Sequence, residues 1–172
     1  MAQSRAEWFY LDLGVADTLE GRFEVIVLHM FLVMDRLQAE GERGQAAAQA
    51  LVERFVTDMD DTMREMGISD LGVPRRVKRA AAALYERAGA YREAIRTGAR
   101  GEALAEALAK HVYGAGCGSA ALPAQLAAYA WSARQELQDQ GFGEISEGLV
   151  TFPHVGQGAA VTEAPGTGSM GQ

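Results

Sequence analysis

The chain has 172 residues, 48% of them hydrophobic, and a formal net charge of −7 at pH 7. This length suits one domain with a real core, and a composition rich in Ala, Leu, Glu and Arg with few Pro favours packed helices. The acidic balance argues against general nucleic-acid binding, which needs a basic surface. The single cysteine, Cys117, excludes an internal disulfide and a multi-thiolate metal site and fits a reducing compartment, so we expect a cytoplasmic protein.

The most apolar part of the sequence predicts a central helix from Arg22 to Leu37. Asp17 or Thr18 can cap it, and Gly21 is interpreted as a break just before it. Its apolar run VIVLHMFLVM falls well short of the ~20 residues that cross a bilayer, so the helix should be buried. The core residues expected on it are Phe23, Ile26, Val27, Met30, Phe31 and Met34.

Two amphipathic helices should follow, joined by the turn GISDLGV. The first, about Gln45 to Met66, carries an apolar arc, and the second runs from Pro74 to about Thr97, where Gly98 terminates it. The arc of the first helix comprises Leu51, Val52, Phe55, Val56, Met59, Met63 and Met66. The core stripe of the second comprises Val77, Leu84, Ala88, Tyr91 and Ile95.

The rest of the chain predicts two further helices, Glu102 to Tyr113 and Pro123 to Gln140. The inner face of the latter should hold Leu126, Tyr129, Ala130, Ala133 and Leu137. The short stretch LVTF could be extended, and the Gly-rich residues 156–172 should form a disordered tail. The expected fold is therefore an all-α, single-domain bundle of about five to six helices, over residues 1–155.

Charges near the turn between the two amphipathic helices have the wrong sign for their positions. Acids gather at the end of the first helix and bases at the start of the second, where each charge costs about 0.3–1 kcal/mol against the helix dipole. The acids are Asp58, Asp61 and Glu65, and the bases, expected opposite the core stripe, are Arg75, Arg76, Arg79 and Arg87. Either the two groups pair across the turn or they present charge to a partner. Arg54, four residues before Asp58, can also pair with it locally.

Methionines and a tryptophan leave a second question open. Met30, Met34, Met59, Met63 and Met66 fit core filling, and the alternative is a pliable surface for an apolar client. Trp131 lies off the inner face of its helix. It is either exposed for a partner or a membrane interface, or covered by the N-terminal aromatic segment Trp8–Tyr10.

The sequence shows no catalytic or metal-ligating pattern. His29, His111 and His154 have no mutual ligand spacing, and His29 is best interpreted as a hydrogen-bonded histidine at the edge of the core. Cys117 and His111 share no helical face, and the glycines around Cys117 follow a helix rather than a strand, unlike a phosphate-binding turn. We therefore expect no enzyme activity, cofactor or metal.

Three stretches carry a family resemblance: DTLEGRFEVIVLH, FVTDMDDTMREMGISDLGVPRRVKR and LYERAGAY, in this order between Asp17 and Trp131. With them the chain resembles the ubiquinol–cytochrome c chaperones, assembly factors of the cytochrome bc complex in mitochondria and alphaproteobacteria. It departs from the family pattern at Ser69, where Gly is expected, and at Leu84 and Glu86, within a stretch where Phe-Tyr-Gly-Arg is commoner.

The resemblance implies a non-enzymatic helper that binds newly made cytochrome b during assembly of ubiquinol–cytochrome c reductase. Because mitochondrial members of the family are associated with a second assembly factor, the resemblance also suggests such a partner. The longest apolar run cannot span a bilayer and the net charge disfavours anionic lipid except at the basic face, so we expect weak peripheral contact with the inner face of the cytoplasmic membrane. A general helical adaptor between soluble proteins is the alternative. The expected partner-binding residues are Asp58, Asp61, Glu65, Arg75, Arg76, Arg79, Tyr85, Arg87 and Trp131.

Overall fold

The computed structural model describes residues 3–67, 72–98, 101–114 and 119–154, and the regular elements within these ranges are all helical. In chain order they are the 3-10 helix η1 (Gln3–Arg5), α1 (Trp8–Leu11), α2 (Leu19–Gln38), α3 (Gly41–Glu65), α4 (Val73–Thr97), α5 (Glu102–Leu108), the π-helix η2 (Ala109–Tyr113), α6 (Ala121–Asp139) and α7 (Phe142–Ser146). The expected all-α bundle is confirmed. The expected extended stretch 149–152 forms no strand. The expected tail at 156–172, Ser69 and Cys117 lie outside the described residues.

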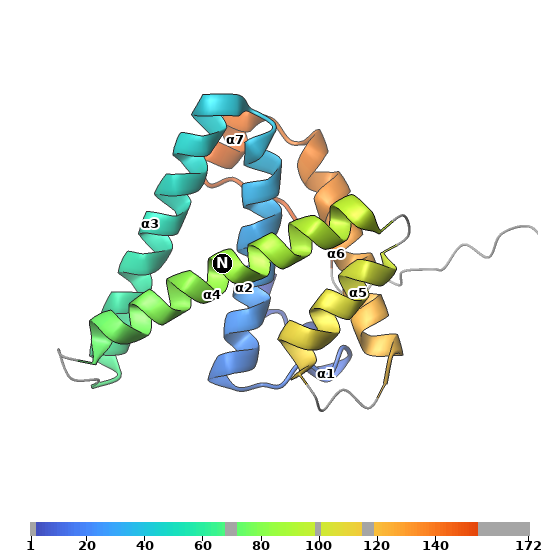
Figure 1. Ribbon diagram of the computed structural model, residues 1–172. Helices are drawn as coiled ribbons and strands as arrows, with labels where there is room; N and C mark the ends of the chain where they lie inside the picture. Colours follow the sequence, from blue (N-terminus) through green and yellow to red (C-terminus); the bar gives the residue numbers. More distant parts are fainter. Residues whose placement is uncertain (1–2, 68–71, 99–100, 115–118, 155–172) are drawn as a thin grey trace, which may run out of the picture.

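Helix α2 is the centre of the fold, and α3, α4 and α6 all pack on it (Figure 1). The Thr18 hydroxyl caps it by accepting a hydrogen bond from the Gly21 backbone N–H at 3.1 Å. Gly21 therefore lies inside the helix, and its interpretation as a break was wrong. A Cβ at position 21 would lie 1.9 Å from the carbonyl oxygen of Ala16, so only glycine lets the incoming loop approach so closely.

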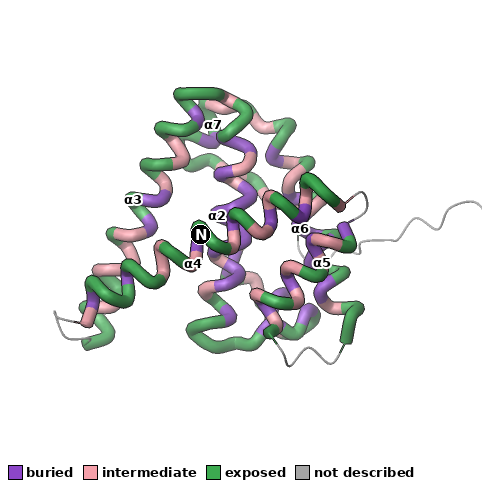
Figure 2. Tube along the Cα trace, in the orientation of Figure 1, coloured by how far each residue is buried: buried purple, intermediate pink, exposed green. Residues whose placement is uncertain are grey.

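The core is divided between the two sides of α2. The larger cluster joins α2 to α1, α4, α5 and α6, and Phe9, Phe31, Tyr91 and Leu137 are fully buried in it. The smaller cluster joins α2 to α3 and α4. Its buried members are Val27, Met30, Met34, Val52, Phe55 and Leu84. Helix α3 lies along the edge of the molecule, and few of its residues are buried (Figure 2).

Residues 55–65 of α3 and 73–85 of α4 form what we call the arm. These two segments meet at the lower left of Figure 1, on the opposite side of α2 from α5 and α6. None of the helices in the described ranges combines the length and apolarity needed to cross a membrane.

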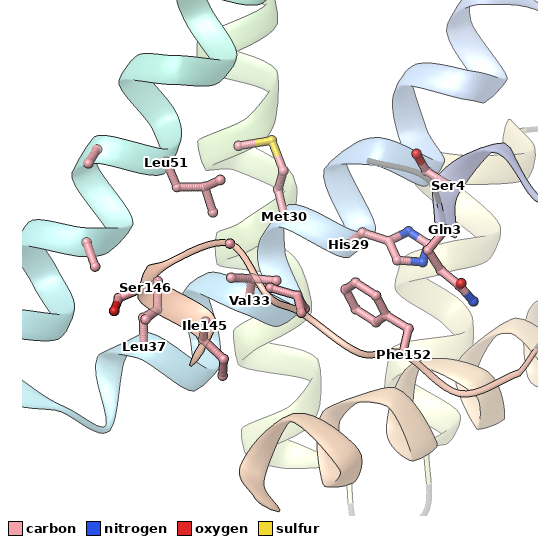
Figure 3. Close-up of a pocket in the computed structure, with 14 residues that line it drawn as sticks. Gln3, Ser4, His29, Met30, Val33, Leu37, Leu51, Ile145, Ser146 and Phe152 are labelled. Carbon is pink, nitrogen blue, oxygen red and sulfur yellow. The ribbon is translucent and has the colours of Figure 1, made fainter. Parts of the chain in front are cut away.

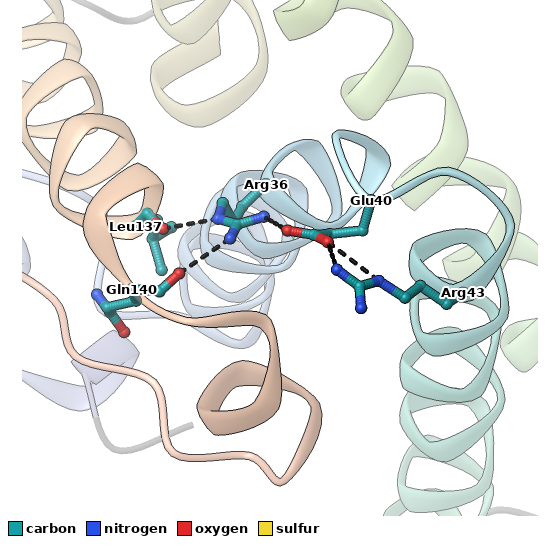
Figure 4. A network of polar contacts seen from close by, with 5 residues as sticks. All are labelled: Arg36, Glu40, Arg43, Leu137 and Gln140. Atoms are coloured by element: carbon teal, nitrogen blue, oxygen red, sulfur yellow. Dashed lines mark hydrogen bonds and ion pairs between the residues drawn. The ribbon is translucent and has the colours of Figure 1, made fainter.

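The turn from α2 into α3 is fixed by a buried arginine (Figure 4). Arg36 donates from Nε to the Leu137 carbonyl at 3.0 Å and from Nη2 to the Gln140 carbonyl at 2.9 Å. It thereby satisfies two backbone acceptors where α6 ends. Its Nη1 also pairs with Glu40, which binds Arg43 in turn. This network ties the start of α3 to the end of α6.

Candidate partner-binding site

The acids expected to bind a partner lie along one exposed side of α3. Asp58 pairs with Arg54 at 2.8 Å, which confirms the expected local pair. Asp61 and Glu65 are exposed and form no hydrogen bond or ion pair with described residues. Two acids near the C-terminus of α3 therefore keep their unfavourable interaction with the helix dipole.

Arg75, Arg76 and Arg79 lie exposed at the start of α4, as expected. We call these three residues the basic row. Between described residues, no ion pair joins α3 to α4, and the basic row has no hydrogen-bond partner there. The interpretation in which acids and bases pair across the turn therefore has no contact to support it in the described chain.

Arg87 differs from the expectation, because it does not point outward with the basic row. Its guanidinium makes hydrogen bonds of 3.0–3.1 Å to both carboxylate oxygens of Glu24 on α2. Only 19% of the Arg87 side chain and 11% of the Glu24 side chain are exposed. Arg87 thus joins α4 to the central helix, while Tyr85, two residues earlier, is 57% exposed.

The methionines divide into buried and partly exposed residues. Met30 and Met34 are core residues of α2. Along α3, Met59 and Met63 are half-buried, and Met66 beyond the end of the helix is 58% exposed. The apolar arc of α3 therefore becomes more exposed to solvent towards the end of the arm.

Trp131 is separated from the arm, since α6 lies on the other side of α2 (Figure 1). Its half-buried indole lies against the start of α5, where a Cβ at Gly101 would be 3.1 Å from the indole Nε1. The Arg134 guanidinium lies 5.7 Å from the ring centroid. The N-terminal aromatic residues Trp8 and Phe9 pack on Tyr129 instead. The structure thus does not bring Trp131 together with the charged residues.

A groove that the sequence did not reveal lies between α2, α3 and the segment from α7 to Phe152 (Figure 3). Its volume is about 670 Å³. Figures 1 and 3 place it on the side of α2 and α3 that faces away from α4. Its main apolar lining residues are Met30, Val33, Leu37, Leu51, Ile145 and Phe152.

The wall formed by the C-terminal segment is held by polar contacts to distant parts of the chain. Gln3 donates to the Pro153 carbonyl at 3.0 Å. The Gln140 side chain makes two hydrogen bonds to the backbone of Thr151, at 2.7 and 2.9 Å. The sequence signal for this wall was the apolar stretch LVTF, residues 149–152, which contains Val150 and Phe152.

His29 lines the groove and is hydrogen-bonded on both ring nitrogens, which confirms the interpretation from sequence. Its Nδ1 donates to the Val25 carbonyl at 2.7 Å, so Nε2 accepts from the Tyr129 hydroxyl at 2.8 Å. Burial lowers the pKa of His29 from 6.5 to about 4, although the bond to Val25 opposes this shift. The imidazole is therefore neutral at pH 7.

Stability should fall as the pH falls from 6.5 to 4. In this window the unfolded chain binds a proton at His29 that the folded chain does not, and the loss can reach about 3 kcal/mol. Burial also lowers the pKa of His111, so both histidines contribute. Urea unfolding across this range should show that the free energy of unfolding depends less steeply on pH for His29→Phe than for the wild type. The same pH dependence in both proteins would contradict the assignment to His29.

Chemically, the arrangement offers charged and apolar surface for binding. Within the described ranges, no three His, Cys, Asp or Glu side chains lie close enough together to hold a metal ion.

Comparisons with known proteins identify the family. The model of the family described as "Ubiquinol-cytochrome C chaperone" matches residues 11–152. The crystal structure of the Cbp3 homolog from Brucella abortus is similar over 91% of this chain and 85% of that chain, with 33% identity and a TM-score of 0.78. No curated protein matches the chain. The chain belongs to the ubiquinol–cytochrome c chaperone family.

Proposed function

We propose that the protein binds newly made cytochrome b and assists its assembly into ubiquinol–cytochrome c reductase. Membership of a chaperone family supports an assembly role. The observation that carries the proposal is the basic row, which is exposed and without ion pairs to described residues in a chain of net charge −7.

The basic row makes no stabilising contact with the part of the chain that the structure describes. Each base near a helix N-terminus costs about 0.3–1 kcal/mol, and no contact within the described chain offsets this cost. A partner with acidic groups would offset it, and complementary charges also select and orient partners. The protein would act in the cytoplasm, and the membrane-embedded client would bring it to the inner face of the membrane as a peripheral protein. A second assembly factor would share the remaining surface.

The test is capture of cytochrome b by an affinity-tagged chain from a membrane-containing lysate, read by mass spectrometry. We expect R75E/R79E to recover less cytochrome b than the wild type, because reversed charges repel at a complementary interface. Its melting temperature should barely change, because exposed substitutions usually alter stability by only about 0.5 kcal/mol. The matched control is R96E/K110E, an equal change of charge at exposed positions away from the arm.

Two outcomes would count against the proposal. Undiminished capture by a well-folded R75E/R79E variant would remove the basic row from the binding surface. Recovery of many soluble proteins without cytochrome b by the wild type would favour the general adaptor.

A further inference from the structure

The face of α2 that lines the groove continues as an apolar stripe to the start of the helix. Its residues recur at intervals of three and four, so they share one face. They are Leu19, Phe23, Ile26, Met30, Val33 and Leu37. The last three line the groove, Phe23 and Ile26 are half-buried, and Leu19 is 63% exposed. At 1.5 Å per residue the stripe is roughly 27 Å long.

Beyond the groove, the side of α3 that lines it changes from apolar to acidic. Ala47, Ala50 and Leu51 line the groove. At the same helical spacing the line continues with Arg54, Asp58, Asp61 and Glu65. Because Arg54 neutralises Asp58, the charge left along this side comes from Asp61 and Glu65. We call the groove and this line of α3 the acidic groove.

We propose that the acidic groove binds a helical segment of a partner protein that has one apolar face and Lys or Arg residues along the adjoining edge. The apolar face would lie on the α2 stripe, and the basic edge would meet Asp61 and Glu65. An amphipathic helix in a groove is a common mode of peptide recognition. This site goes beyond the proposed role of the basic row, which lies on α4, whereas the groove faces away from α4.

The charges on α3 beyond the groove favour this occupant over others. Residues 155–172 contain no Lys or Arg, so the chain's own C-terminal residues offer nothing to Asp61 and Glu65. Anionic lipid would be repelled by the same two carboxylates. A basic helical edge complements them and leaves the apolar stripe covered.

Designed peptides test the proposal without cytochrome b. The first is a fluorescein-labelled helical peptide of ~18 residues with Leu on one face and Lys along its edge, a length set by the stripe. The second replaces each Lys with Glu, and the third permutes the first so that its apolar face is lost. Fluorescence anisotropy with the full chain should show binding of the Lys peptide, at least tenfold weaker binding of the Glu peptide, and none of the permuted one.

Variants of the chain locate the binding. D61K/E65K should lower the affinity for the Lys peptide at least tenfold and raise the affinity for the Glu peptide. E42K/E106K, at exposed positions outside the groove, should leave both affinities unchanged. Ala50→Trp should weaken binding of the Lys peptide, because the larger side chain would fill the groove from an exposed position. Circular-dichroism melts confirm that each variant is folded.

The same experiments distinguish a basic helix from other occupants of the groove. Equal affinity for the Lys and Glu peptides, or an unchanged affinity in D61K/E65K, would overturn the proposal. So would a dimer of the chain that the Lys peptide dissociates, or displacement of the Lys peptide by a synthetic peptide of residues 155–172. A failed peptide test leaves cytochrome b capture through the basic row standing, because that experiment uses different residues.

Discussion

Replacing Phe31 with alanine should lower the free energy of unfolding by about 3–5 kcal/mol, the range for truncating a buried aromatic side chain whose site cannot collapse. Phe31 has 0% of its surface exposed and belongs to the larger core cluster. Its ring meets that of Tyr91 on α4 with centroids 5.5 Å apart in a T-shaped arrangement. The cluster around Phe31 includes residues of α1, α4, α5 and α6, so little can move in to fill the space.

Denaturant unfolding measures the effect, with Leu149→Ala as the control. Leu149 is 63% exposed, so its truncation should cost only about 0.5 kcal/mol. A loss below about 1 kcal/mol for Phe31→Ala, well under the usual range, would mean that the region around α2 repacks freely.

The long helices could be predicted because their periodicity is strong. The sequence predicted the second amphipathic helix from Pro74 to about Thr97, and α4 spans Val73–Thr97. The short helices α1 and α7 were missed, because an isolated helix of four or five residues has no stability of its own. Tertiary burial of Phe9 and Ile145 holds them in place.

The candidate site was predicted only where a single helix determines it. Arg75 and Arg79 are exposed as their spacing indicates. Arg87 was misplaced, because helical periodicity gives a direction on one helix and cannot show that Glu24 of another helix lies there. The groove depends on α2, α3 and the segment that ends at Phe152, and no local pattern reveals how segments so far apart in sequence come together.

The misplaced arginine leads to the second large prediction. Arg87→Met should destabilise the fold by about 3–5 kcal/mol, towards the lower end of that range because the pair is not fully buried. The substitution keeps much of the apolar stem but leaves the Glu24 carboxylate with no cation in a largely dry position. Removing one member of a buried pair costs more than the pair contributes, because the remaining charge stays desolvated.

A double-mutant cycle with Glu24→Gln isolates this interaction. Because this second substitution replaces the carboxylate with a neutral amide, E24Q/R87M should be less destabilised than the sum of the two single variants. Arg96→Met is the matched control, because Arg96 forms a solvent-exposed ion pair with Glu93. This variant should lose less than about 1 kcal/mol of its free energy of unfolding. Additive effects of the two substitutions would show that Glu24 and Arg87 do not stabilise each other. If Arg87→Met kept wild-type stability yet captured less cytochrome b, Arg87 would belong to the binding surface with the basic row.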